Sequence, residues 1–266
     1  MKTRRALTLT LSVAAAIAAG EARAEDRPSE VYVDVGFNTR NPGGANLTTW
    51  TPNLGLFAAV DDNIAISADW GLTTFSVDEV DLENPGVKPL NPFVAAHLTP
   101  QIGDFSLRLG LGLAIPVAEG SDEASLRLYE SARAIRGSWD PWLYATETIS
   151  VAIPARVAWQ PLNLVRLAAE GAAFLMIATD GSGERLGFQG ALEAALVFDG
   201  FEVGARIQGV RPQDEVTRAA FEPFAAVGVG PVWLRGRLTM NLAEPDGFAF
   251  DEDGIWGAHL GLAYTF

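Results

Sequence analysis

The feature that most constrains the fold is an alternation of apolar residues with polar or small ones, which recurs along nearly the whole chain. The clearest example is the segment 105–115, where Phe, Leu and Ile take every odd position and Ser, Arg, Gly and Ala take the even ones. Successive side chains of a β-strand point to opposite faces, whereas a helix repeats every 3.6 residues. The alternation therefore predicts strands with one apolar face, and it excludes a helical architecture for most of the chain.

The alternation occurs in twelve separate segments of about ten residues, the length that a tilted strand needs to cross a bilayer. We expect twelve strands, rather than ten or fourteen, with bounds good to a few residues. They cover residues 30–39, 50–60, 64–76, 89–100, 105–117, 148–159, 164–177, 188–198, 201–210, 220–229, 232–242 and 255–266.

The connections between these segments alternate in length. Short turns follow the even strands, at 61–63, 101–104, 160–163, 199–200 and 230–231. Long loops follow the odd strands, at 40–49, 77–88, 118–147, 178–187, 211–219 and 243–254. This asymmetry is typical of an all-β, transmembrane, up-and-down antiparallel β-barrel, with short periplasmic turns and long extracellular loops.

A soluble barrel would bury its apolar face and a membrane barrel would expose it to lipid, so the period alone does not decide between them. No charged residue lies on the apolar face of any expected strand, where it would cost about 2–4 kcal/mol at the bilayer midplane. Aromatic residues gather near both ends of that face, as in the two interfacial girdles of a membrane barrel. At the long-loop end they are Phe37, Trp50, Phe188, Phe221 and Trp256, and at the short-turn end Phe105, Trp159, Phe198, Phe201 and Phe266.

The N-terminus has the pattern of a secretory signal peptide. A basic start is followed by the apolar stretch 6–19 and by Ala22-Arg23-Ala24, which places small residues at a cleavage site. We expect residues 1–24 to be a signal peptide and residues 25–266 to form a single barrel domain.

The last expected strand ends in Tyr264 and Phe266, preceded by apolar residues at every second position. This end resembles the assembly signal of Gram-negative outer-membrane β-barrel proteins, and together with the strand pattern the whole chain resembles that class, in a porin-like form. The resemblance identifies no subfamily. It implies insertion by the outer-membrane assembly machinery, a location in the cell outer membrane, and contact with its lipids and lipopolysaccharide.

The inward face of the expected barrel carries both signs of charge in near balance. The residues that we expect to line the lumen are Arg108, Arg156, Arg166, Glu170, Glu193, Arg206, Glu222, Arg235 and Arg237. Neighbouring guanidinium groups repel unless carboxylates or an anionic solute lie between them. Two interpretations stay open: a polar selectivity zone that draws anions or zwitterions, or an Arg–Glu network that plugs a narrow barrel.

The longest loop, 118–147, has apolar residues at roughly helical spacing between Leu126 and Ile135. Ser121 is a candidate N-cap for such a helix, and Gly137 is a natural stop. The third long loop of general porins commonly folds into the barrel and narrows it, and this loop is similar in position and length. We expect the same here; an external cap over the barrel mouth is the alternative.

Composition excludes several kinds of chemistry. The chain has no cysteine, which removes disulfides, thiol nucleophiles and thiolate metal sites, and its net charge of −14 argues against nucleic-acid binding. His97 and His259 both face inward by parity, and neither has an obvious serine partner at strand spacing. The acidic groups 78–79 and 251–253 suit hard cations, but solvated acidic loops explain them more simply. We expect no catalytic residue, no metal site and no cofactor.

The sequence therefore predicts a passive porin-like channel for small polar or anionic solutes. The alternative is a closed structural or interaction barrel with a plugged lumen, which presents acidic surface loops to a partner.

Overall fold

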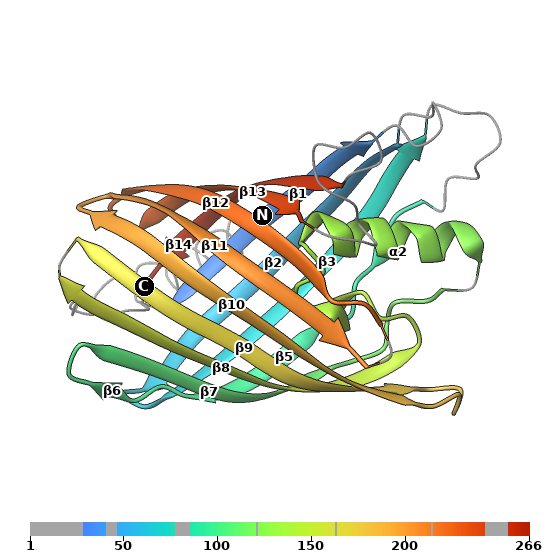
Figure 1. Cartoon of the computed structure of the whole chain (residues 1–266), viewed down its shortest axis with the longest axis horizontal. Coiled ribbons are helices and arrows are strands. Elements are labelled where there is room, and N and C mark those ends of the chain that lie inside the picture. Colours follow the sequence, from blue (N-terminus) through green and yellow to red (C-terminus); the bar gives the residue numbers. More distant parts are fainter. Residues whose placement is uncertain are drawn as a thin grey trace, which may run out of the picture.

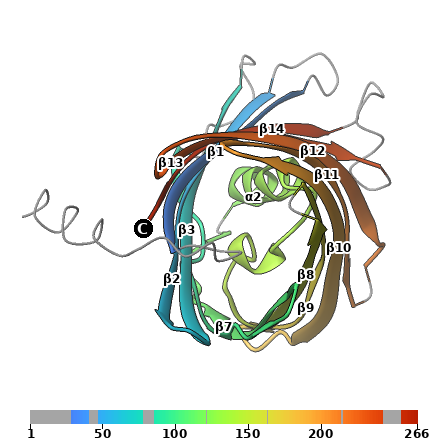
Figure 2. The same cartoon turned by 90° about the vertical axis from the view of Figure 1, so that its left-hand side faces the viewer.

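Twelve strands close into an antiparallel barrel in the computed structural model, which describes residues 29–40, 47–77, 86–120, 122–162, 164–213, 215–242 and 255–266 (Figures 1 and 2). The wall strands are β1 (Glu30–Arg40), β2 (Leu47–Asp61), β3 (Ile64–Val77), β5 (Phe93–Leu98), β7 (Phe105–Ala114), β8 (Thr148–Leu162), β9 (Val165–Ala178), β10 (Glu184–Phe198), β11 (Phe201–Pro212), β12 (Arg218–Val229), β13 (Val232–Asn241) and β14 (Trp256–Thr265). The expected signal peptide, 1–24, lies outside the described residues.

Each wall strand pairs with the next along the chain, and β1 pairs with β14 to close the ring, with Glu30 opposite Thr265. Two strands of two residues lie off this ring: β4 (Lys88–Pro89) pairs with β3, and β6 (Gln101–Ile102) pairs with β7. The all-β, up-and-down, twelve-stranded architecture predicted from the alternation is therefore confirmed.

The strand bounds differ from the expected ones most clearly at the fourth wall strand. The expected strand 89–100 is shortened to β5, which is flanked by Pro92 and Pro100. A proline has no backbone N–H to donate to a neighbouring strand. At both flanks the proline carbonyl still accepts a hydrogen bond, from Ile115 and from Leu107.

The alternation sorts side chains between the two faces of the barrel as expected. On β7, Leu109 and Leu111 are more than half exposed on the outside. Gly110 and Gly112 face inward and are buried, beneath the side chains of His97 and Phe93. Members of the two predicted aromatic girdles lie beside each other on adjacent strands. The rings of Phe37 and Trp50 stack with centroids 5.5 Å apart at the long-loop end, and those of Phe105 and Trp159 stack at 5.8 Å at the short-turn end.

The long third loop folds into the barrel, as expected, and does not cap it from outside. Its helix α2 (Glu123–Ile135) and the short 3₁₀ turn η2 (Pro141–Leu143) lie within the ring of strands (Figure 2). The helix packs against the inner faces of β14, β1, β2 and β3. No described helix is long and apolar enough to cross a membrane.

The ends of α2 are set by local chemistry. The N-cap is Asp122 rather than the expected Ser121: its carboxylate accepts a hydrogen bond of 2.7 Å from the backbone N–H of Ser125. At the other end the chain leaves the helix after Ile135, and Gly137 takes a φ of 59°, a left-handed conformation that costs glycine little. The predicted stop at Gly137 is confirmed.

Candidate functional site

A cavity of about 860 Å³ fills the barrel between its short-turn end and the inward loop. All twelve wall strands contribute to its lining. All nine charged residues that the sequence places in the lumen border it, from Arg108 on β7 to Arg237 on β13. Each of the nine side chains thus lies toward the inside of the barrel.

A second cavity of about 600 Å³ lies on the other side of the loop, toward the long-loop end, between α2 and the ends of β9, β10 and β12. Among the described residues, none borders both cavities. The segment 136–144 contributes Trp139 and Trp142 to the first and Pro141 and Tyr144 to the second. This segment is therefore the partition between an inner cavity and an outer cavity.

The inner faces of β8 to β12 carry a continuous network of ion pairs, which we call the paired wall. Arg156 lies 2.9 Å from Glu170 and 3.1 Å from Glu193. Glu193 also lies 3.2 Å from Arg166, which in turn pairs with Glu202. Each of these arginines is thus shared between two carboxylates.

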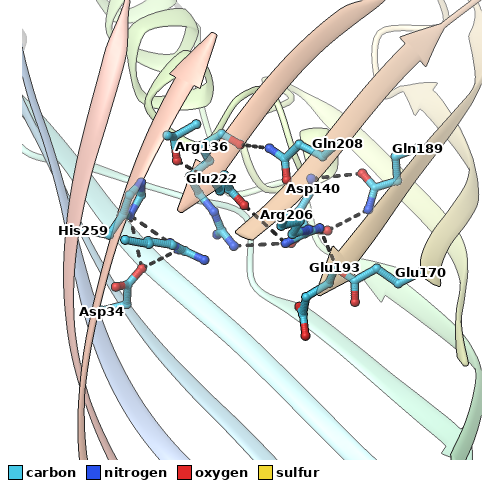
Figure 3. Close-up of polar contacts among 12 residues, drawn as sticks. Asp34, Arg136, Asp140, Glu170, Gln189, Glu193, Arg206, Gln208, Glu222 and His259 are labelled. Atoms are coloured by element: carbon cyan, nitrogen blue, oxygen red, sulfur yellow. Dashed lines mark hydrogen bonds and ion pairs between the residues drawn. The ribbon is translucent and has the colours of Figure 1, made fainter. Parts of the chain in front are cut away.

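The paired wall continues toward the partition through Arg206. This guanidinium lies 2.5 Å from Glu170 and 3.5 Å from Glu222, and Thr239 donates a hydrogen bond of 2.7 Å to Glu222 (Figure 3). The Arg206 side chain is only 12 % exposed. A charge this well covered needs such partners, because desolvation penalises an unpaired ion.

A smaller set of pairs connects β13, β14 and β1. Arg237 lies 2.8 Å from Asp34, and His259 lies 3.4 Å from the same carboxylate (Figure 3). Nearer the short-turn end, Arg235 lies 2.6 Å from Glu30, with the arginine side chain 44 % exposed. Arg235 and Glu30 form what we call the rim pair.

The opposite side of the inner cavity, on β2, β3, β5 and β7, is different, and we call it the open wall. Its one arginine, Arg108, makes no ion pair or hydrogen bond with any residue that the structure describes; its guanidinium carbon lies 5.7 Å from the centre of the Phe57 ring. The nearby histidine, His97, shares a hydrogen bond of 2.8 Å with Ser67. Ser67 lies on the neighbouring strand β3, so no spacing within one strand could have pointed to it as a partner.

The partition is attached to the wall by side chains that reach its backbone. Asn241 donates to the carbonyl of Ala134 at 3.0 Å, and His259 lies 3.0 Å from the carbonyl of Ile135. Gln208 donates to the carbonyl of Arg136 at 2.8 Å (Figure 3). These bonds fix the end of α2 against β11, β13 and β14.

Gln189 on β10 forms a two-way contact with Asp140. It accepts a hydrogen bond from the Asp140 backbone N–H and donates one to the Asp140 carboxylate, each at 3.0 Å (Figure 3). Asp140 also lies 3.4 Å from Arg136. Burial raises the pKa of Asp140, because desolvation outweighs the stabilising effects of Arg136 and Gln189 on the charged form.

The sequence did not single out Trp139, Asp140 or Arg136 as lumen residues. Arg136, which directly follows α2, borders the inner cavity. The guanidinium of Arg206 lies 4.0 Å from the centre of the Trp139 ring, within reach of a cation–π interaction. The only hint in the sequence was that Arg136, Trp139 and Asp140 lie close together in one loop. These residues reach the cavity only because the loop folds into the barrel.

Within the described part of the chain, no group of three or more His, Asp or Glu side chains is arranged to hold a metal ion. The acidic groups 78–79 and 251–253 lie outside the described residues. His259 is buried against the partition, where its ring contacts the Ile135 carbonyl and Asp34.

No family model matches this chain, and no curated protein matches its sequence. Its structure is similar to that of an outer-membrane channel of Pseudomonas putida F1 (TM-score 0.62, 15 % identity, covering 93 % of this chain and 98 % of the other). It is also similar to the NanC porin (TM-score 0.58, 6 % identity, 89 % and 100 % covered) and to the KdgM porin (0.56, 8 %, 88 % and 99 %). At these identities the likeness shows the fold alone: the chain has the barrel architecture of these porins and of this channel.

Proposed function

We propose that the protein is a passive, porin-like channel of the outer membrane for small polar or anionic solutes. The observation that carries the proposal is the inner cavity of about 860 Å³, bordered by charged side chains from around the ring. A barrel whose only task is to hold its shape has no need of a polar chamber large enough for many water molecules. The solved structures that it resembles are named as porins and as a channel.

The mechanism is diffusion through the lumen, which is narrowed where the partition lies between the inner and the outer cavity. Charged and hydrogen-bonding groups of a pore replace part of the hydration shell of a solute, which lowers the cost of entering a confined space. Because most of the lumen arginines are paired with carboxylates, the wall is polar without a strong excess of either sign. Such a wall favours small polar and zwitterionic solutes and admits small anions.

The location and the partners follow from the two ends of the chain. We propose that residues 1–24 direct export, that Tyr264 and Phe266 are recognised by the assembly machinery, and that the apolar exterior meets outer-membrane lipids and lipopolysaccharide. Replacing Phe266 with alanine should reduce the amount of heat-modifiable, folded protein in outer-membrane fractions while leaving the secreted precursor level unchanged. Equal folded amounts in both strains would remove the assembly role.

A second candidate is the closed structural or interaction barrel. The specific observation in its favour is the attachment of the partition by Asn241, Gln208 and Gln189, with no described residue bordering both cavities. A partition held this firmly narrows a channel or closes it.

Recording from a planar bilayer separates the two candidates. We expect the purified protein to insert with a stable open level in symmetric potassium chloride, and liposomes that contain it to swell in small sugars and amino acids. A correctly folded barrel that inserts without conductance and causes no swelling would favour the closed barrel. The heat-dependent mobility shift of the same sample on a gel provides the control for folding.

A further inference from the structure

We propose that Arg108 forms a binding subsite for a small organic monocarboxylate in the inner cavity. The inference rests on the proposed channel function and deepens it, since it names a solute class and the residue that selects it. The observation behind it is that Arg108 borders the cavity and lacks a carboxylate partner among the described residues.

The neighbourhood of Arg108 increases its need for an anion. Arg156 lies directly opposite Arg108 in the β7–β8 register. The carboxylates next to Arg156, Glu170 and Glu193, are already bonded to it at 2.9 and 3.1 Å. Two guanidinium groups at neighbouring positions repel each other. Glu170 and Asp140 attract Arg108 at longer range, but neither forms an ion pair with it, so its N–H donors are left for a mobile anion.

The carboxylate on the open wall, Asp69, already has a hydrogen-bond partner. Asp69 on β3 accepts a hydrogen bond from the Tyr32 hydroxyl and makes no ion pair with Arg108. Its charge attracts Arg108 at longer range but forms no ion pair with it. A solute with one negative charge can therefore bind Arg108, whereas a second charge would meet Asp69, Glu170 and Glu193.

The remaining groups of the open wall suit a carboxylate with a small organic body. The Arg108 guanidinium presents parallel N–H donors that match the two oxygens of a carboxylate. Phe57 contacts both Arg108 and the His97 ring, whose centroid is 5.8 Å from that of Phe57, and offers an apolar surface. The pair Ser67–His97 supplies further hydrogen-bonding capacity beside it.

The test measures binding and does not require conductance. Saturation-transfer NMR on the full barrel in detergent micelles, with propionate as the probe and propionamide as its uncharged match, gives a dissociation constant for each variant. We expect saturable binding of propionate to the wild type and much weaker binding of propionamide. Arg108→Gln should weaken propionate binding tenfold or more, and Arg108→Lys should fall between, because it keeps the charge but loses the paired donors.

The matched control is the double variant Arg235→Gln/Glu30→Gln, which removes the rim pair without changing the net charge, and it should stay within twofold of the wild type. Absence of saturable binding, equal affinity in Arg108→Gln, or equal affinity for propionamide would each overturn the subsite. Inorganic phosphate that binds as tightly as propionate would overturn the monocarboxylate class. Binding that depends on Arg108 in a barrel without conductance would instead contradict the channel.

Discussion

Arg108 and Arg156 are direct neighbours across the β7–β8 pair, yet they belong to two different walls of the same cavity. Arg156 is held by two carboxylates, and its side chain is 9 % exposed. Arg108 contacts only the Phe57 ring among the interactions that the structure gives it. An arginine at the same level of the barrel is therefore ion-paired on one wall and not ion-paired on the other.

The difference lies in where the carboxylates are. On the paired wall, acids on β9, β10, β11 and β12 each pair with an arginine, and Glu170 and Glu193 each pair with two. The open wall has Ser67, His97 and aromatic rings in the corresponding places, and its cavity-lining carboxylate, Asp69, is bonded to Tyr32 and not to an arginine. We infer that the paired wall stiffens the lumen, whereas the open wall is the part free to interact with a solute.

The largest expected effect comes from breaking the paired wall at the residue that matches Arg108. Arg156→Gln leaves Glu170 and Glu193 each with one arginine fewer, and removing one partner of a buried ion pair costs about 3–5 kcal/mol. We expect a loss near the lower end of that range, because Arg206 and Arg166 remain. The measurement is the free energy of unfolding from urea titration in lipid vesicles.

Arg108→Gln is the matched comparison in the same assay. It removes a cation without a counter-ion, so we expect the free energy of unfolding to change by less than about 1 kcal/mol, a range typical of substitutions that break no paired group. If both variants lost the same stability, the distinction between the two walls would fail.

An intermediate effect is expected where the paired wall supports the partition. Gln189→Ala removes the two-way contact with Asp140 and leaves a buried carboxylate with fewer donors. Hydrogen bonds to charged groups contribute about 1.5–3 kcal/mol, so we expect a loss of about 2 kcal/mol. Gln208→Ala, which removes a single bond to a neutral carbonyl, should cost about 1 kcal/mol. A reversed order of these two variants would show that the partition is not held through Asp140.

The smallest effect should come from the rim pair. Arg235 is 44 % exposed and bonded to Glu30, and exposed ion pairs contribute about 0–1 kcal/mol. Arg235→Gln should change the free energy of unfolding by less than about 1 kcal/mol, and added salt should reduce that difference further. If Arg235→Gln lowered the free energy of unfolding as much as Arg156→Gln, the stabilisation from an ion pair in this lumen would not depend on its exposure.

The sequence was sufficient for the barrel and for the face on which each residue lies. Alternation places Arg108, His97 and His259 inside, and a strict two-residue period leaves no other choice for them. The helix in the third loop was also predictable from its apolar spacing and from Gly137. These features depend on short stretches of chain, which is why they could be derived locally.

The contacts across the lumen could not be derived in the same way. The hydrogen bond between Ser67 and His97 depends on the register of β3 against β5, where Ala65 lies opposite His97. The pairing of Arg206 with Glu170 depends on the stagger of three strands. Whether Arg136 faces solvent or the cavity depends on which side of α2 the barrel covers. Register, stagger and loop placement are properties of the closed ring and not of any one segment.

We infer that the segment 136–144 narrows the lumen between the two cavities and does not close it. The most direct test compares the single-channel conductance of the wild type with that of a variant lacking residues 121–140, recorded in the same bilayer and salt. We predict a stable open level for the wild type and a conductance severalfold higher for the shortened chain. A silent wild type, or equal conductance in two folded barrels, would contradict the account.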